Sequence, residues 1–361
     1  MSRPGTRGQV LVTDGGNGQN RSAVAAVRAL AAGGFAPVVT VSGPGSLAAA
    51  SRFCARTVAV PPVDDRGYAD AVRHEVARSG YAAVLPASDA ALVALDWPGH
   101  VLVDKSRLAA RAAAADLPVP PEQAFDDGAA LLAAADDLPY PVVVKPAVRT
   151  SSAQPPVQRA ADPRELATAA QARGPLVVQP FVPDPMTAVA GVVWRGRLAA
   201  VVHQRYLRTW PTETGTASAL VTVDGDRRLE ERLAVLLEGH EGVFQAQFVG
   251  RYLVDVNPRV YGSLPLAVAA GANLPSVYAD LRCGCSVPFA RGATGVRYRW
   301  VEGDVRAVLT AWRRHERGAV ASAAALLPRR GTAHSTESLL DPGPAVARLR
   351  HGLRARRATR G

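Results

Sequence analysis

GVFQAQFVGRYLVDVNPRVYGS, residues 242–263, predicts two β-strands joined by a short loop. Side chains in a strand point alternately to its two faces, so Asp255 and Asn257 share one face of the second strand. Gln247 shares that face only if it lies opposite an odd-numbered residue. We therefore predict the three-residue loop Val249-Gly250-Arg251, because a two-residue turn would turn Gln247 to the other face.

The polar side chains of this ribbon indicate a cation site. Burying two polar side chains on one face is costly unless they have partners or ligands. Mg²⁺ prefers oxygen ligands, usually one or two from the protein beside phosphates and water. We predict that Gln247, Asp255 and Asn257 hold the metal, with Arg259 just beyond the strand. The plainer alternative is that Asp255 only caps the turn at Asn257-Pro258.

Two lysines stand out against the basic composition. All the other residues among the 42 Lys and Arg are arginines, and only Lys105 and Lys145 are ammonium groups. Lysine is a compact point charge, whereas arginine is a bulky planar fork. Lys105 opens a predicted helix and Lys145 ends the predicted strand of LPYPVVVKPAV. A site that needs one cation poised on a phosphate would keep a lysine for this reason; the alternative is that two lysines remain by chance.

The chain divides into differently patterned regions. Residues 1–103 alternate strand and helix patterns, as in QVLVT, NRSAVAAVRALAAGG and FAPVVTVSG, which predicts a parallel βαβ domain. Residues 104–290 turn antiparallel, with AVAGVVWRGRLAAVVHQ alternating around an Arg-Gly turn. The fold class expected is α/β followed by α+β.

In this order the motifs resemble the ATP-grasp superfamily, most closely carbamoyl-phosphate synthetase and its single-domain relatives. They are Lys105 after a Rossmann-like domain, YPVVVKP, VVQPFV and Q-F-(x)₆-D-V-N-P-R. The resemblance covers about residues 9–275. It implies a Rossmann-like pre-ATP-grasp domain (1–103), a two-lobed ATP-grasp domain (104–290) with a mobile lid lobe at about 118–180, and a basic C-terminal segment (291–361).

The resemblance also implies ligands. ATP would lie between the two lobes with Mg²⁺, or Mn²⁺ as an alternative. Lys105 and Lys145 would contact its phosphates. The strand from Gln179 to Val182 would be the hinge, with Phe181 and the backbone of Val182 near the adenine. Arg259 would steady an acyl phosphate, and Arg205 would reach the same phosphates.

The sequence departs from the family pattern at several of these positions. AVRTSSAQPP, residues 147–156, lacks the glycines of a lid loop, although Ser151 and Ser152 still offer donors to a phosphate. Met186 stands where relatives commonly have a glutamate on the ribose, and Asp184 is the substitute we expect. Asp255 replaces a usual glutamate, so the metal site has one firm carboxylate.

DGGNGQNRSA, residues 14–23, is not a dinucleotide fingerprint, because Arg21 occupies the third glycine position and no acidic residue follows at the ribose distance. Two interpretations stay open. The helix start binds an anionic part of the second substrate through backbone N–H groups and Asn17, or the stretch is a plain tight turn.

Charge and cysteines limit the class of protein. Fifteen arginines stand against five acidic residues from Arg291 onward, so this segment is either a docking element for an anionic partner or a solvated tail. The three cysteines lack a zinc-binding pattern and are expected to be reduced thiols. No span of membrane length and no secretory signal is visible, so we expect a cytoplasmic protein.

The function expected is an ATP-dependent, ADP-forming ligase that activates a carboxylate as an acyl phosphate and couples it to an amine. Its partners would be small-molecule carboxylate and amine substrates, with a homodimer as one option for its assembly. The alternatives are a carboxyphosphate-forming enzyme that uses bicarbonate, and a nucleotide-binding module with weakened catalysis and a basic docking tail.

Overall fold

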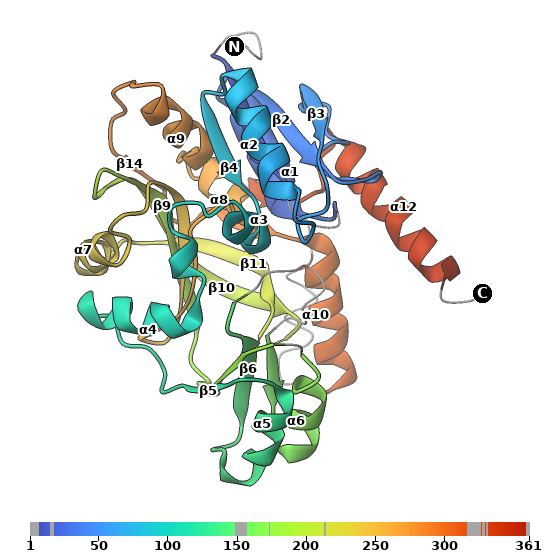
Figure 1. Ribbon diagram of the computed structural model, residues 1–361, viewed down its shortest axis with the longest axis vertical. Helices are drawn as coiled ribbons and strands as arrows, with labels where there is room; N and C mark the ends of the chain where they lie inside the picture. Colours follow the sequence, from blue (N-terminus) through green and yellow to red (C-terminus); the bar gives the residue numbers. More distant parts are fainter. Residues whose placement is uncertain are drawn as a thin grey trace.

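The computed structural model describes residues 7–14, 18–148, 157–172, 174–212, 214–315, 326, 329 and 331–358. Three sheets organise this part of the chain (Figure 1). The predicted phosphate contacts Ser151 and Ser152 and the loop residue Asn17 lie outside the described residues.

The N-terminal sheet is parallel, as the alternating pattern predicts, with the strand order β3-β2-β1-β4. Its strands are β1 (Gln9–Thr13), β2 (Ala36–Val41), β3 (Arg56–Ala59) and β4 (Ala83–Pro86), and its helices are α1 (Arg21–Ala32), α2 (Tyr68–Ser79) and α3 (Asp89–Ala94). The chain runs from β1 out to β3 and returns to β4 on the other side of β1. The carboxyl ends of β1 and β4 therefore form the switch point at which α/β sheets bind ligands.

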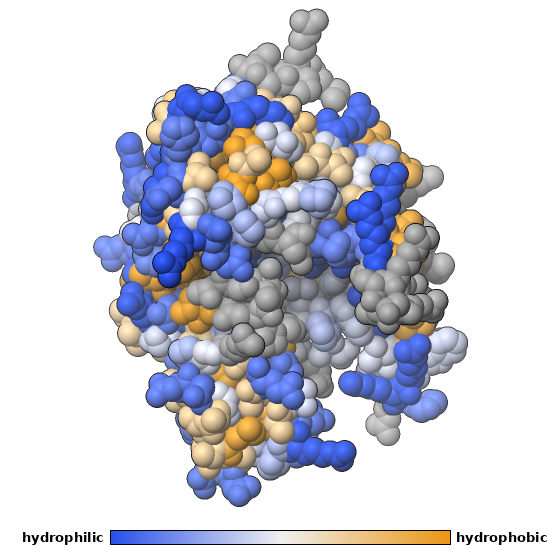
Figure 2. All heavy atoms as spheres, turned by 45° about the vertical axis from the view of Figure 1, so that its right-hand side comes forward, coloured by the Kyte–Doolittle hydropathy of each residue, from blue (hydrophilic) through white to orange (hydrophobic). Residues whose placement is uncertain are grey.

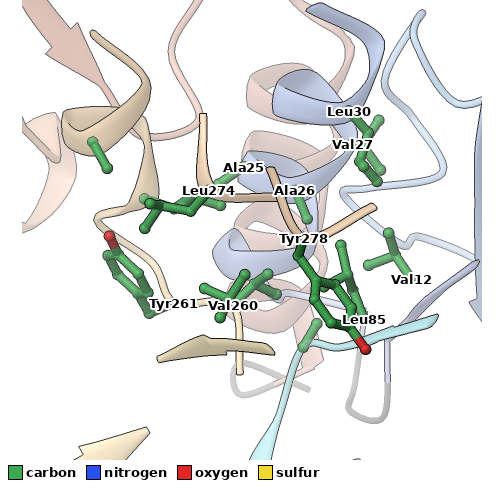
Figure 3. Packing of buried hydrophobic residues seen from close by; sticks show 14 of the residues in the cluster. Val12, Ala25, Ala26, Val27, Leu30, Leu85, Val260, Tyr261, Leu274 and Tyr278 are labelled. Carbon is green, nitrogen blue, oxygen red and sulfur yellow. The ribbon is translucent and has the colours of Figure 1, made fainter. Parts of the chain in front are cut away.

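Helix α1 is buried between this sheet and the rest of the molecule. Val12 of β1, Leu30 of α1 and Tyr278 belong to one buried cluster (Figure 3). The alanine-rich sequence of α1 suits this position, because small side chains let neighbouring helices approach closely. The side chain of Asn20 caps the helix by accepting from the N–H groups of Ser22 and Ala23.

The large sheet is mainly antiparallel, in the order β13-β12-β9-β10-β11-β15-β16, with β14 beside β10. Its strands are β9 (Met186–Trp194), β10 (Arg197–Trp210), β11 (Thr216–Val223), β12 (Gly242–Val249), β13 (Tyr252–Asn257), β14 (Ala290–Arg291), β15 (Arg297–Arg299) and β16 (Thr332–His334). Arg195 and Gly196 join β9 to β10 with φ angles of 49° and 73°. This left-handed two-residue turn matches the strand twist, and the predicted Arg-Gly turn is present.

Alternate residues of the large sheet point to its two faces and pack into two different buried clusters. The helices on its faces are α4 (Lys105–Ala114), α7 (Arg227–Leu236), α8 (Leu264–Ala269) and α9 (Leu274–Arg282). Val201 packs in the cluster with α4 and α7, whereas Val202 packs in the cluster with α1, α8 and α9. The sheet is thus covered on both faces, and its second face joins the N-terminal sheet.

A small antiparallel sheet with the order β5-β8-β6-β7 lies at the other end of the molecule (Figure 1). Its elements are β5 (Gln123–Phe125), α5 (Gly128–Ala133), β6 (Val142–Pro146), β7 (Gln158–Ala160), α6 (Pro163–Ala169) and β8 (Leu176–Pro180). Leu131, Val144 and Leu166 belong to a buried cluster of its own. The small sheet therefore has a separate core.

The basic C-terminal segment is not a free tail along its described length. Strands β14, β15 and β16 belong to the large sheet, and α10 (Val301–Arg313) contacts β10 and β11. Asp341 is 1% exposed and accepts hydrogen bonds from Arg28 Nε at 2.8 Å and Ser51 Oγ at 2.7 Å. These buried contacts anchor the segment to α1 and the N-terminal sheet.

Helix α12 (Gly343–Ala358) ends the described chain and points away from the body (Figure 1). Leu349 and Leu353 on this helix are exposed. Hydrophilic residues cover most of the face in Figure 2, with smaller apolar groups between them. None of the described helices combines the length and the apolar character that a membrane crossing requires.

Candidate active site

A cavity of about 480 Å³ lies where the small sheet, the large sheet and α3 meet. Its polar lining includes both lysines of the chain, Lys105 and Lys145, together with Gln247 and Asp255. Residues that are far apart in the sequence therefore line the same cavity.

Lys105 is the first residue of α4, which Asp104 caps by accepting from the N–H of Ser106 at 3.0 Å. The cap fixes the start of the helix, and the ammonium of Lys105 forms an ion pair with Asp255. Burial alone would raise the pKa of Asp255, but the ammonium groups of Lys105 and Lys145 hold it below its usual value. Asp255 is therefore ionised at neutral pH.

Lys145 ends β6 and is only 6% exposed. Its Nζ donates to the carbonyl oxygen of Val254 at 3.1 Å. Burial lowers the pKa of Lys145 to about 8, with a further contribution from the nearby positive charge of Lys105. Keeping the buried ammonium of Lys145 charged costs free energy. An anionic ligand in the cavity would offset this cost by pairing with the ammonium.

A β-bulge sets the register of β12 and β13. Gln247 pairs with Asp255 and Phe248 pairs with Leu253, so Val254 is the extra residue of β13. The connection is the two-residue turn Gly250-Arg251, and the predicted three-residue loop is wrong. The bulge shifts the alternation by one residue, as an odd-length loop would, and so Gln247 still lies opposite Asp255.

The three predicted metal ligands lie side by side on β12 and β13. Asn257 Nδ2 donates to Asp255 Oδ2 at 3.2 Å, and Gln247 Nε2 donates to the side chain of Gln245 at 3.2 Å. Asn257 Oδ1 accepts from Arg259 at 2.7 Å. In the described part of the chain no three His, Cys, Asp or Glu residues gather as a metal site. One carboxylate flanked by two amides is a donor set that suits a hard cation sharing its coordination with phosphates.

Arg259 lies behind this row rather than in the cavity lining. Its Nε donates to Asp89 of α3 at 2.6 Å, while Nη2 contacts Asn257. Asp89 itself lines the cavity. Arg259 thus ties the switch-point end of the N-terminal sheet to β13.

The strand β8 and the residues after it form another wall. Gln179, Phe181, Val182 and Asp184 all line the cavity. Gln179 Nε2 donates to Glu122 Oε2 at 2.9 Å. Glu122 was not predicted, because nothing in the local pattern around PVPPEQ marks it as a site residue.

No protein-family model matches this chain, and no curated protein matches its sequence. Solved structures resemble it. L-amino acid ligase from Bacillus licheniformis is 17% identical with a TM-score of 0.55, covering 78% of this chain and 75% of that one. N5-carboxyaminoimidazole synthetase from Staphylococcus aureus, complexed with ADP, is 12% identical with a TM-score of 0.59, covering 80% and 81%. The biotin carboxylase domain of the Hydrogenobacter thermophilus 2-oxoglutarate carboxylase is 15% identical with a TM-score of 0.57, covering 80% and 73%.

The chain has the ATP-grasp fold. The resemblance that we inferred from the order of the motifs is therefore confirmed for the fold. In this fold the motif residues Lys105, Lys145, Gln179, Gln247 and Asp255 surround one cavity.

Arg205, which we expected to reach the phosphates, lies outside the cavity lining. It is exposed, whereas Arg208 lines the wall. The register of β10 against β11 shifts on both sides of Arg208, so side chains do not alternate regularly between the two faces there. Asp304, which is 0% exposed, holds Arg208 by accepting from its Nη2 at 3.0 Å. An irregular register of this kind leaves no local signal in the sequence.

In the described part of the stretch before α1, the side chain of Asn20 already engages two backbone donors of the helix start. Asn20 Oδ1 already accepts from the N–H groups of Ser22 and Ala23 at 2.9 and 3.3 Å. The guanidinium of Arg21 lies 3.7 Å from the ring centre of Trp300. The first turn of α1 is thus capped by its own chain.

Proposed function

We propose that the protein is an ATP-dependent, ADP-forming ligase that activates a carboxylate as an acyl phosphate and couples it to an amine. The observation that supports this most is the convergence of Lys105, Lys145 and Asp255 on one cavity. Two ammonium groups next to a carboxylate are the charges that a transferring phosphoryl group and its metal require.

In this proposal the chain's own residues position and shield the phosphates. Lys105 leaves Asp255 and turns to a phosphate, and Lys145, already desolvated, contacts a second phosphate. Gln247, Asp255 and Asn257 would hold Mg²⁺, or Mn²⁺, which supplies further charge neutralisation when bound. Asn257 then gives up its bond to Arg259, which becomes available to an anionic intermediate.

The reaction balances without any further cofactor. A substrate carboxylate oxygen attacks the γ-phosphorus of ATP, and ADP leaves. The amine then attacks the acyl carbon, and inorganic phosphate leaves to give the amide. Arg259 and Arg208 are the cations that we assign to the acyl phosphate, with Arg208 replacing the earlier candidate Arg205. Holding both substrates in one cavity supplies a large part of the rate enhancement.

The domain arrangement belongs to the same proposal. We assign residues 1–103 to a pre-ATP-grasp domain and residues 104–290 to the ATP-grasp domain, with the lid lobe at about 118–180. The separate core of the small sheet supports a lobe that moves as a unit. Phe181, Val182 and Asp184 stay our candidates for the adenine and ribose contacts.

The test is ADP and phosphate release from Mg·ATP in the presence of pooled amino acids, followed by single carboxylate and amine pairs. A thermal-shift titration with ATP runs in parallel. Stimulated release of both products with mass-spectrometric detection of an amide is the expected outcome. The proposal fails if no mixture stimulates release and ATP does not raise the melting temperature. ATP binding without ADP formation under any mixture would favour the weakened nucleotide-binding module instead.

A second candidate is carboxyphosphate chemistry with bicarbonate. It is favoured by two of the structural neighbours, a carboxyaminoimidazole synthetase and a carboxylase domain whose complex contains bicarbonate. It predicts that bicarbonate alone stimulates ATP turnover. The ligase proposal predicts stimulation only by an organic carboxylate.

A further inference from the structure

The end of the cavity around Gln179 has apolar side chains in its lining. Val143 is the cross-strand partner of Gln179, and Phe181 and Val182 follow it along the chain. The guanidinium of Arg159 lies 4.9 Å from the ring centre of Phe181 and covers it. The phosphate-binding cations Lys105 and Lys145 line the same cavity. A nucleotide in this cavity therefore has apolar walls for its base beside β8.

Gln179 is the polar side chain of this apolar end, and its neighbour across the sheet is Glu122. The register between β5 and β8 pairs Gln123 with Val178, which continues by one residue to bring Glu122 opposite Gln179. Gln179 is 5% exposed, and its Nε2 donates to Glu122 Oε2 at 2.9 Å. The amide is therefore held on one side by a cross-strand carboxylate.

The chemistry of the partner decides which way the amide faces. A glutamine amide has one donor end and one acceptor end, whereas an ionised carboxylate can only accept. Glu122 must therefore take the NH₂ end of Gln179. Among the described residues no donor is bonded to Gln179 Oε1, so the acceptor end is left for a ligand in the cavity that Gln179 lines.

We propose that Glu122 is a specificity-determining residue that orients Gln179 so that the site selects an adenine base over a 6-oxo purine. Adenine carries an NH₂ donor at ring position 6, whereas guanine and hypoxanthine carry an oxygen there. The oxygen of Gln179 accepts from the adenine amine. A 6-oxo purine would set two acceptors against each other, which leaves buried polar groups unpaired. The inference rests on the proposed function only in requiring that ATP binds in this cavity.

The experiment compares the dissociation constants of ATP and inosine triphosphate by calorimetry, with Mg²⁺ and without other substrates. Inosine triphosphate isolates the effect because it replaces the 6-amine with an oxygen while keeping the triphosphate. For the wild-type protein we expect ATP to bind at least about tenfold more tightly. Both constants are measured on one folded sample, so changes in stability or in local charge largely cancel in their ratio.

Glu122→Gln is the decisive variant. Its amide can donate or accept, so Gln179 is free to turn over, and the preference for ATP should fall at least about threefold. The double variant Glu122→Gln/Gln179→Glu restores an acceptor-only group facing the base, and the preference should return to near the wild-type value. Glu231→Gln, which removes an exposed carboxylate on α7, is the matched control and should leave the ratio unchanged.

The outcomes separate the two proposals. A wild-type protein that binds neither nucleotide would refute the proposed function and this inference with it. ATP binding with an unchanged ratio in Glu122→Gln would refute the orienting role of Glu122 alone. Loss of preference in Glu122→Gln together with its recovery in the double variant would support the role, because a merely structural contact would not be rescued by exchanging donor and acceptor.

Discussion

The ammonium of Lys145, at the end of β6, donates to the carbonyl oxygen of Val254, the bulged residue of β13, at 3.1 Å. A regular ladder would direct that carbonyl into strand pairing. The bulge takes Val254 out of the ladder, and the same irregularity brings Gln247 opposite Asp255. One extra residue therefore aligns the candidate metal ligands and links the small sheet to the large one.

Replacing Lys145 with methionine should stabilise the protein and weaken ATP binding. Burial lowers the pKa of Lys145 to about 8 from the 10.5 of an unperturbed lysine. The unfolded chain therefore binds more protons between these values, and the wild-type free energy of unfolding rises with pH in that window. Below pH 8 the full cost of the buried charge is present. Lys145→Met should gain about 1–2 kcal/mol at pH 7 in urea denaturation, with the gain vanishing above about pH 10.5. A variant less stable than wild type at pH 7 would contradict the account.

Replacing Lys105 with methionine should have the opposite effect on stability. The ammonium of Lys105 is the ion-pair partner of Asp255, and without it this carboxylate loses the main group that holds its pKa down. We expect a loss of about 1 kcal/mol at pH 7, reduced because Asp255 is partly exposed. The loss should be smaller at about pH 3, below the 3.8 of an unperturbed aspartate, because the carboxyl group of Asp255 becomes protonated as the pH falls toward its lowered pKa. Equal losses at both pH values would argue against the ion pair.

Asp255→Asn should remove most of the activity by weakening metal binding. The change keeps the size of the side chain but removes the charge at the one carboxylate flanked by Gln247 and Asn257. We expect ADP release to fall at least about 100-fold and half-maximal activity to require more Mg²⁺. Titrating Mg²⁺ and Mn²⁺ against ADP release measures both effects. Unchanged metal dependence would remove Asp255 from the metal site.

Arg208→Gln and Arg205→Gln form a matched pair of variants on one strand. Arg208 lines the cavity and is held by the buried Asp304, whereas Arg205 is exposed and outside the lining. The change at Arg208 should lower kcat/KM at least about tenfold, which corresponds to about 1.4 kcal/mol of transition-state stabilisation. The change at Arg205 should stay within about twofold, because exposed substitutions rarely matter. Steady-state kinetics of both variants decide between the two arginines.

Asp341→Ala should loosen the C-terminal segment. Asp341 is 1% exposed and bonds Arg28, Ser51 and the backbone N–H of Arg52. Removing it leaves the partly buried guanidinium of Arg28 without its carboxylate, at a cost of about 3 kcal/mol. Thermal unfolding and limited proteolysis after α10 should both report the change. Retention of the wild-type melting temperature would mean that the segment is anchored elsewhere.

Local patterns in the sequence predicted much of the fold. The helix and strand periods, the turn at Arg195-Gly196 and the common face of Asp255 and Asn257 all follow from covalent geometry that repeats every few residues. The order of the motifs then led to the ATP-grasp fold. Glu122 and Arg208 were not predicted from the sequence. The role of Glu122 depends on a cross-strand neighbour and that of Arg208 on a bulge, and neither feature leaves a local signal in the sequence.

By itself, the sequence determined which residue types are present and how often they alternate, and this suffices to predict strands, helices and their apolar faces. Tertiary structure alone decided that a bulge rather than a longer loop aligns Gln247 with Asp255, and that the basic segment joins the large sheet. The physical reason is that contacts between segments far apart in the sequence set strand register and burial. A local sequence pattern carries no information about the free energies of these contacts.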